Sequence, residues 1–266
     1  MDNRPIGVFD SGIGGLTIVN ALAKILPHEK IIYVGDTARV PYGNKSTERI
    51  QQYSEEITRW LIQEECKIVV VACNTASSHA LDNLKSKFNI PIIGVIEPGV
   101  EASIYATQNN RIGVLGTYGT IRSDAYGQAL RRLNKDILVI NQACPLFVPL
   151  VEEGWVSGEV PETIAKIYLE NIVASDVDTL ILGCTHYPLL KSTINKIMNI
   201  KIKLVDSVDT TASVVQSVIN ELELYPEKGK SGGIFCHVSD SVDLFESLAG
   251  RFLEVHISDL SHIDIF

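Results

Sequence analysis

The sequence predicts an α/β protein made of two similar halves, each built on a parallel β-sheet. Short runs rich in valine and isoleucine recur along the 266 residues, and stretches long enough for a helix separate them. Buried strands that alternate with helices are typical of parallel sheets, whose faces the helices cover. The sequence around two of the early runs also resembles the sequence around two later runs. A chain of this length suits one large domain or two modest ones.

Eight apolar runs predict eight strands. They are residues 6–9, 31–34, 68–72, 92–95, 112–115, 137–140, 180–182 and 202–205. Longer amphipathic stretches between them predict helices. The clearest are residues 47–64, 97–106, 161–173 and 189–198. Pro161 suits the first turn of the third of these helices, where a missing N–H costs nothing.

An internal repeat indicates that the two halves share a topology. IGVFDSG at 6–12 resembles IGVLGTY at 112–118, and VVVACNT at 69–75 resembles LILGCTH at 180–186. Both pairs join the end of a strand to the loop after it, and they occur in the same order. The residues after 206 carry few strand or helix signals, so we expect them to pack back onto one half.

The composition excludes several classes of protein. The 23 Lys and Arg against 32 Asp and Glu give a net charge of −9, which argues against nucleic acid or an anionic membrane as the main partner. No apolar run is long enough to span a bilayer, and the first residues do not resemble a secretion signal. We therefore expect a cytoplasmic protein without a membrane partner.

The five cysteines are widely spaced and form no CxxC pair. They stand at positions 66, 73, 144, 184 and 236. This spacing argues against a disulfide framework and against a zinc ribbon. We expect free thiols and no bound metal.

The loops that follow the strands are the candidate site, because ligands of open α/β folds bind beyond the carboxyl ends of the strands. Four such loops mix small residues with short polar ones. They cover residues 10–15, 35–43, 73–75 and 184–188. The first has Thr17 where the dinucleotide pattern G-x-G-x-x-G needs glycine, and it lacks the Lys-Ser/Thr ending of a P-loop. It is either a tight turn alone or a nest of backbone N–H groups that binds an anion.

Cys73 and Cys184 occupy equivalent places in the repeat, directly after predicted buried strands and before residues that can cap a helix. A helix N-terminus lowers the pKa of a thiol. A single such cysteine would be read as an inert core thiol, but two in matched positions indicate a functional pair. The pair could form a disulfide, bind a metal or act as two opposed acid/base groups. The last use fits a cleft between similar halves, since it removes a proton from one face of a carbon and returns one to the other.

Three further residues are candidates for this chemistry. Asp10 and His186 share their loops with Ser11 and Thr185, so each thiol has a titratable neighbour that could tune or relay its proton. The alternatives are that Asp10 only caps the glycine-rich turn and that His186 only packs in the core. Glu152 follows an apolar run and is either a site residue or a solvated loop charge.

Four motifs together resemble those of the cofactor-independent aspartate/glutamate racemase family. They are DSGIGGLT at 10–17, GDTARVPYG at 35–43, ACNTAS at 72–77 and GCTHYP at 183–188. The resemblance implies two α/β domains with a pseudo-two-fold relation that face each other across the active site. It places residues 1–97 and 207–266 in the first domain and residues 98–206 in the second. It further implies a homodimer that interconverts L- and D-glutamate without a cofactor and supplies D-glutamate for peptidoglycan.

The resemblance also implies roles for individual residues. Cys73 would be the base acting on D-glutamate and Cys184 the base acting on L-glutamate, with catalytic support from Asp10, His186 and Glu152. The implied substrate-binding positions are Asp10, Ser11, Pro41, Tyr42, Gly43, Asn74, Thr75, Thr185 and His186. Neutral donors among them would stabilise charge that develops toward the substrate carboxylate, as an oxyanion hole does.

Two other functions remain open at this point. A racemase for aspartate or for a hydantoin-type substrate is close, because the length of the pocket cannot be measured from sequence. A non-catalytic protein that clamps a small anion between its halves would explain the glycine-rich loops but not the paired cysteines. In each case we expect a small-molecule ligand and no nucleic acid.

Overall fold

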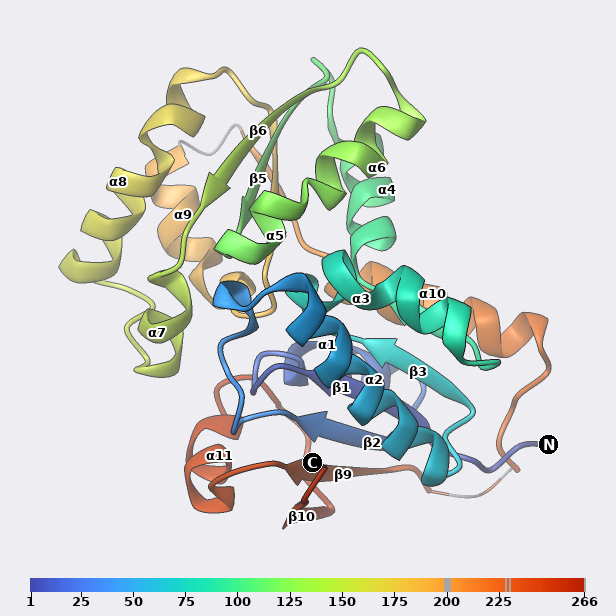
Figure 1. Cartoon of the computed structure of the whole chain (residues 1–266). Helices are drawn as coiled ribbons and strands as arrows, with labels where there is room; N and C mark the ends of the chain where they lie inside the picture. The colour runs from blue at the N-terminus through green and yellow to red at the C-terminus, as the bar shows by residue number, and fades with distance from the viewer. Residues whose placement is uncertain (199–201, 228, 230, 266) are drawn as a thin grey trace.

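The computed structural model describes residues 1–198, 202–227, 229 and 231–265. Two parallel sheets, each flanked by helices, make up the molecule (Figure 1). The first half contains β1 (Ile6–Asp10), α1 (Leu16–Ile25), β2 (Lys30–Gly35), the 3-10 turn η1 (Tyr42–Asn44), α2 (Thr47–Gln63), β3 (Ile68–Val71), α3 (Asn74–Lys87) and β4 (Ile92–Gly94).

The second half begins with α4 (Ile96–Ala106), which packs on the second sheet. It continues with β5 (Arg111–Gly116), α5 (Tyr118–Ser123), α6 (Ala125–Leu133), β6 (Leu138–Ala143), α7 (Phe147–Glu152), α8 (Glu159–Ala174), β7 (Thr179–Gly183), the 3-10 turn η2 (Tyr187–Leu190), α9 (Lys191–Met198) and β8 (Lys203–Val205). The C-terminal segment then adds α10 (Val208–Glu221), β9 (Gly233–Val238), α11 (Val242–Ala249) and β10 (Asp259–His262).

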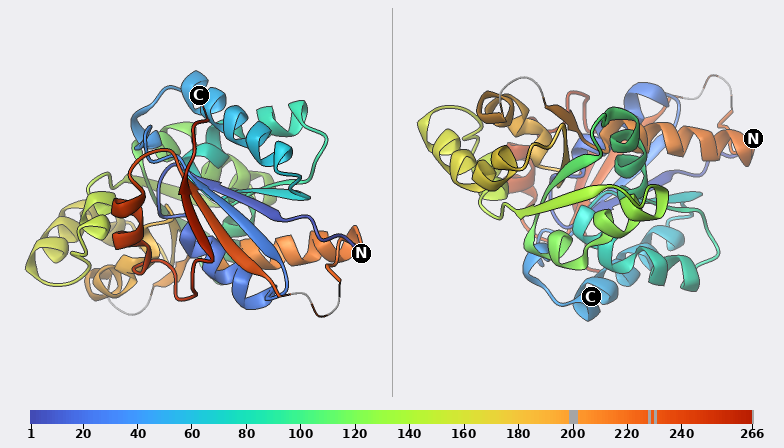
Figure 2. Two further views of the ribbon diagram at one scale, coloured as in Figure 1. Left: turned by 90° about the horizontal axis from the view of Figure 1, so that it is seen from below. Right: turned by 90° about the horizontal axis from the view of Figure 1, so that it is seen from above.

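The two sheets share one topology. The first has the strand order β10-β9-β2-β1-β3-β4 and the second β6-β5-β7-β8. Strands β2-β1-β3-β4 therefore correspond one by one to β6-β5-β7-β8, which confirms the two similar halves. The eight predicted strands are all present, and β9 and β10 extend the first sheet beside β2 (Figure 2, left).

The helices agree with the sequence in part. The four predicted helices correspond to α2, α4, α8 and α9, but the last begins with the 3-10 turn η2 rather than as one continuous α-helix. Ser46 caps α2 by accepting a hydrogen bond from the Arg49 N–H, as short hydroxyl side chains commonly do. Helices α1, α3, α5, α6, α7, α10 and α11 were not singled out by the sequence.

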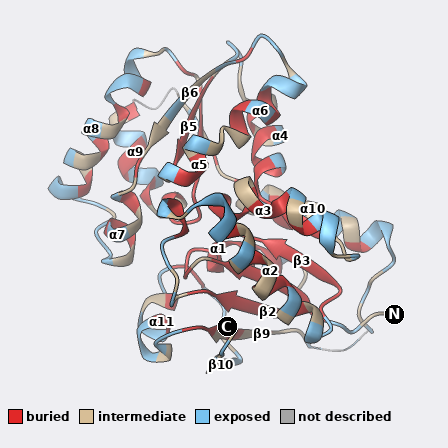
Figure 3. Ribbon diagram, viewed as in Figure 1, coloured by how far each residue is buried: buried red, intermediate tan, exposed pale blue. Residues whose placement is uncertain are grey.

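The inner strands β1, β3 and β7 are buried along their whole length and β5 in all but its first residue, whereas the residues of the edge strand β6 are all half-buried or exposed (Figure 3). On the first sheet, Phe9, Val34 and Val71 pack toward α2 and α3, and Val8 and Val70 pack on the opposite face with α1. On the second sheet one face packs against α4 and α6 and the other against α7, α8 and α9. The cluster that covers this last face also contains the α1 side of the first sheet, so one core runs through both halves.

The strand register fixes where the motif loops meet. Asp10 pairs with Gly35, and Phe9 pairs with Val71. The loops that start at Asp10, Asp36 and Ala72 therefore leave the same edge of the first sheet, which is its carboxyl edge. None of the helices in the described part of the chain combines the length and apolar character needed to cross a bilayer.

Candidate active site

The first half contributes a thiol, a hydroxyl and a carboxylate to the site. Cys73 is the N-cap of α3, and its Sγ accepts a hydrogen bond from the Ala76 N–H at 3.4 Å. Its Sγ also lies 3.6 Å from the Ser11 Oγ. Asp10 is 1% exposed, and its Oδ2 accepts from the Gly12 N–H at 2.9 Å. Its buried Oδ1 has no hydrogen-bond partner among the described residues, so it remains available as an acceptor.

The environment of Cys73 reverses one expectation from the sequence. The thiol does sit at a helix N-terminus, but the predicted fall in its pKa is wrong. Burial, followed by the charge of Asp10, raises the pKa of the Cys73 thiol to about 12. Removing a thiolate from water costs more free energy than the helix N-terminus contributes, so the Cys73 thiol stays protonated at neutral pH.

The second half contributes Cys184, His186 and Glu152. Cys184 follows β7, and its Sγ lies 3.9 Å from Nδ1 of His186. The Nε2 of His186 lies 3.0 Å from the Glu152 carboxylate at the end of α7. Burial alone would lower the pKa of His186, but the contacts with Cys184 and Glu152 outweigh it and raise this pKa to about 10. Glu152 thus pairs with the histidine beside the second thiol.

The C-terminal segment covers this histidine. The ring of Phe252 meets the ring of His186 edge-on, with centroids 5.4 Å apart. Arg251 donates a hydrogen bond to the main-chain oxygen of Glu152. The turn after α11 lies between β9 and β10, which are strands of the first sheet. It therefore reaches across from the first half to the second.

A glycine brings the motif loops of the two halves into contact. A Cβ at Gly14 would lie 2.2 Å from the Thr185 Oγ1 and 2.5 Å from the His186 Nδ1. The absence of a side chain there lets the glycine-rich loop rest directly on the loop of Cys184. Ser11 of the same glycine-rich loop lies 3.6 Å from the Cys73 Sγ, so this loop borders the surroundings of both thiols. The two thiols and their neighbours form one site.

The amide and hydroxyl side chains after Cys73 also reach the second half. The Asn74 Nδ2 donates to the Tyr126 hydroxyl at 2.8 Å. The Thr75 Oγ1 lies 2.8 Å from the Thr117 Oγ1 and 3.2 Å from the Thr120 Oγ1. These contacts join α3 to α5 and α6 across the site.

Comparison with known proteins identifies the family. The family model described as Asp/Glu/Hydantoin racemase matches residues 16–215. The chain belongs to this family. It is 46% identical to a glutamate racemase of Geobacter metallireducens, and the match covers 98% of this chain and 97% of that protein. The expected enzyme class, an amino-acid racemase, is confirmed.

Solved structures of the racemase family agree in fold. A glutamate racemase of Francisella tularensis, solved in complex with D-glutamate, superposes with a TM-score of 0.93 at 41% identity, covering 100% of this chain and 99% of that one. An aspartate racemase homologue of Pyrococcus horikoshii superposes with a TM-score of 0.59 at 16% identity, covering 82% of this chain and 99% of that one. The second comparison shows a shared fold alone.

The residues of the 41–43 loop of the racemase differ in burial. Tyr42 and Gly43 are buried, whereas Pro41 is exposed. The Tyr42 hydroxyl donates to the Asp36 carboxylate at 2.5 Å. The one proton of this hydroxyl is therefore used in a hydrogen bond within the protein. A Cβ at Gly43 would lie 2.7 Å from the Thr117 Cβ, which places the loop beside the threonine cluster.

Several residues of the racemase site were missed from the sequence. Thr117 follows β5 as Ser11 follows the end of β1, so the internal repeat already contained its signal. Tyr126 and Phe252 reach the site only through tertiary packing, and no local pattern marks them. All five cysteines are buried free thiols. Among the residues that the structure describes, no group of three or more His, Cys, Asp or Glu could hold a metal ion.

Proposed function

We propose that this chain is a glutamate racemase that uses Cys73 and Cys184 as its two acid/base groups. One observation carries the proposal. The two halves share a topology, and each brings one thiol, from the end of an equivalent strand, to the glycine-rich loop, where Ser11 lies beside Cys73 and Gly14 touches the residues after Cys184. Two bases on opposite faces of one carbon are what inversion of that carbon requires.

The reaction follows from this placement. In the direction from L- to D-glutamate, the Cys184 thiolate takes the α-proton while the Cys73 thiol gives its own proton to the opposite face. The carbon exchanges one C–H bond for another, and each turnover leaves Cys184 protonated and Cys73 ionised. The reverse direction exchanges these roles. No electron leaves the system, so the residues alone balance the chemistry.

The raised pKa of Cys73 suits this reaction. A substrate α-proton is far less acidic than an ordinary thiol, so a weakly basic thiolate would remove it poorly. Burial and Asp10 raise the pKa of Cys73 to about 12, which makes its thiolate a stronger base and keeps its thiol protonated as the acid. The cost is that little thiolate exists at neutral pH.

The remaining side chains have a place in binding. The unpartnered Asp10 Oδ1 would accept from the substrate ammonium. Asn74, Thr75 and Thr185 supply neutral donors for the α-carboxylate, where charge develops as the proton leaves. Ser11 and the backbone of residues 41–43 would hold the distal carboxylate. His186 and Glu152 would support Cys184.

The test is racemisation of L-glutamate in heavy water without added cofactor. We expect D-glutamate that carries deuterium at the α-carbon, and activity that survives exhaustive removal of pyridoxal phosphate. Cys73→Ser and Cys184→Ser should each abolish racemisation, because an alcohol is too weak an acid to replace a thiol. Activity that depends on pyridoxal phosphate would overturn the two-thiol mechanism.

Substrate choice needs its own comparison. Polarimetry with L-glutamate and L-aspartate side by side should show a clear preference for glutamate, and a preference for aspartate would refute the assignment. The supply of D-glutamate for peptidoglycan, a homodimeric state and a cytoplasmic location belong to the same proposal.

A further inference from the structure

Asp36 is a buried carboxylate outside the residues assigned so far. It directly follows β2, and its side chain is 0% exposed. Burying a carboxylate is costly unless donors surround it. Its Oδ2 accepts from the Arg39 Nε at 2.7 Å and from the Tyr42 hydroxyl at 2.5 Å. Its Oδ1 accepts from the Ser239 hydroxyl at 2.9 Å.

These donors come from two distant parts of the chain. Arg39 and Tyr42 belong to the loop that leads to the proposed substrate-binding backbone at 41–43. Ser239 follows β9 in the C-terminal segment, and its Oγ in turn accepts from the Ala38 N–H at 3.1 Å. Asp36 and Ser239 thereby hold the start of the loop, its middle and its end.

Aromatic packing stiffens the same loop from the outside. The Arg39 guanidinium lies 4.1 Å from the centre of the Tyr53 ring and pairs with Glu56, both on α2. The Tyr42 and Tyr53 rings are 5.7 Å apart. The Asp36 main-chain N–H donates to the Asp10 carbonyl at 3.1 Å, which ties the loop to the first motif.

We infer that Asp36 is a positioning residue that fixes the 41–43 backbone for the distal carboxylate of the substrate. This inference rests on the proposed glutamate racemase function. Asp36 touches no reacting atom and acts through Tyr42 and Arg39. The distal carboxylate does not change charge during racemisation, so contacts to it are equally strong in the ground state and the transition state. Losing such contacts raises KM and leaves kcat nearly unchanged.

Asp36→Asn is the direct test. An amide keeps the size of the carboxylate but presents NH₂ where Arg39, Tyr42 or Ser239 already donates, so at least one buried donor loses its partner. We expect KM for glutamate to rise about tenfold, as the loss of a buried hydrogen-bond network allows, with kcat within about twofold of wild type. Enantiomers have equal free energies, so kcat/KM must fall by the same factor in both directions.

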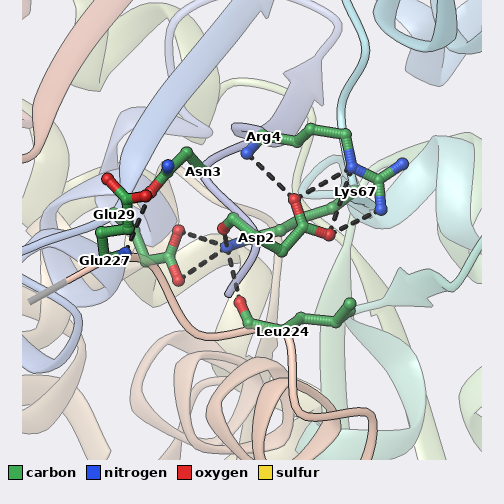
Figure 4. A network of polar contacts seen from close by, with 7 residues as sticks. All are labelled: Asp2, Asn3, Arg4, Glu29, Lys67, Leu224 and Glu227. Atoms are coloured by element: carbon green, nitrogen blue, oxygen red, sulfur yellow. Dashed lines mark hydrogen bonds and ion pairs between the residues drawn. The ribbon is translucent and has the colours of Figure 1, made fainter.

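Glu29→Gln is the matched control. Glu29 precedes β2 as Asp36 follows it, is 4% exposed, and accepts from the Lys67 Nζ at 2.8 Å (Figure 4). Lys67 also donates to the carbonyls of Asp2 and Leu224. The same change of carboxylate to amide at this far end of the strand should lower the melting temperature and leave KM and kcat unchanged.

The outcomes separate the two proposals. A wild-type protein that does not racemise glutamate would defeat the proposed function. If the wild type does racemise glutamate, an unchanged KM in Asp36→Asn, or an equal rise in KM in Glu29→Gln, would defeat the positioning role. If Asp36→Asn does not fold, Tyr42→Phe and Ser239→Ala each remove one hydrogen bond from Asp36. At least one of them should then raise KM about threefold or more without lowering kcat, and unchanged KM in both would overturn the inference.

Discussion

The two thiols of the site have opposite electrical surroundings. Cys73 lies near the Asp10 carboxylate, whose charge adds to burial in raising the thiol pKa. Cys184 lies 3.9 Å from His186, whose pKa of about 10 makes it a cation at neutral pH. The halves share a topology, but their two thiols lie beside side chains of opposite charge.

This asymmetry predicts how Cys73 reacts with iodoacetamide. Only the thiolate is alkylated, and an ordinary thiol ionises near pH ~8.5. Because the pKa of Cys73 is raised to about 12, its labelling rate in short pulses should still be climbing above pH ~10, where the urea-unfolded protein has levelled off. Peptide mapping identifies the site, and bound glutamate should protect it.

Cys73→Ser is the control for that peptide, which should then carry no label. A labelling midpoint for folded Cys73 below that of the unfolded chain would show that the helix N-terminus, rather than burial, dominates the pKa of this thiol.

The raised pKa of Cys73 also makes the stability of the folded protein depend on pH. The unfolded state loses this proton first as pH rises, so the folded state is progressively destabilised between pH 9 and about 12.

Among the elements, the loop between β1 and α1 depends on the missing side chain of Gly14. We expect Gly14→Ala to push the Thr185 and His186 side chains away from their places, since its Cβ would overlap both. Overpacking of this kind costs about 1–3 kcal/mol of stability. Displacement of groups beside Cys184 should lower kcat by about 100-fold, because catalytic geometry tolerates errors of less than ~1 Å.

Gly250→Ala provides the comparison for this prediction. Gly250 has φ −63°, and a Cβ there would meet nothing within 4 Å. Alanine at this position should leave both stability and turnover close to wild type. If Gly14→Ala were equally silent in steady-state kinetics and thermal melting, the two motif loops would not need their close contact.

The elements also show what the sequence could and could not predict. Strands such as β3 are buried on both faces, so their unbroken apolar runs were easy to recognise. Helix α3 is covered by the sheet on one side and by α2 and α5 on others. Its sequence NTASSHALDNLKSK mixes small polar and apolar residues and shows no single apolar face. Periodicity fails for a helix placed between two halves, although the cysteine at its start was found.

The same limit applies to the site. Residues that directly follow strands, such as Asp10, Cys73 and Cys184, could be placed because parallel strands end at one edge. Their electrostatic state could not, since the pKa of Cys73 depends on burial by residues far away in the chain. Partners such as Phe252 and Tyr126 were equally invisible, because only the packing of helices against sheets brings them to the site.

At the scale of the whole molecule, the C-terminal segment joins the halves. Its strands β9 and β10 complete the first sheet, Ser239 holds Asp36, and Arg251 and Phe252 contact Glu152 and His186. The domain boundaries at 97/98 and 206/207 stay a prediction. The first of them falls within the first turn of α4, a helix that packs on the second sheet.

The continuous core predicts that both halves unfold together. One cluster includes Val70 of the first sheet and Leu182 of the second. The chain has two tryptophans, Trp60 on α2 in the first half and Trp155 after α7 in the second. Fluorescence of Trp155→Phe therefore reports the first half and that of Trp60→Phe the second. Each substitution can itself change stability, and circular dichroism of each variant measures that change. After this correction we expect the two variants to unfold at the same urea midpoint.

Leu182→Ala then tests whether the halves are coupled. Leu182 is 1% exposed, and truncation of a buried leucine costs about 2–5 kcal/mol. If the shared core makes unfolding cooperative, Leu182→Ala must lower the urea midpoint reported by Trp60 in the first half as well. The shift should equal the one that Trp155 reports in the second half. A shift confined to Trp155 would mean that the halves unfold separately and that the contacts across the site contribute little to holding them together.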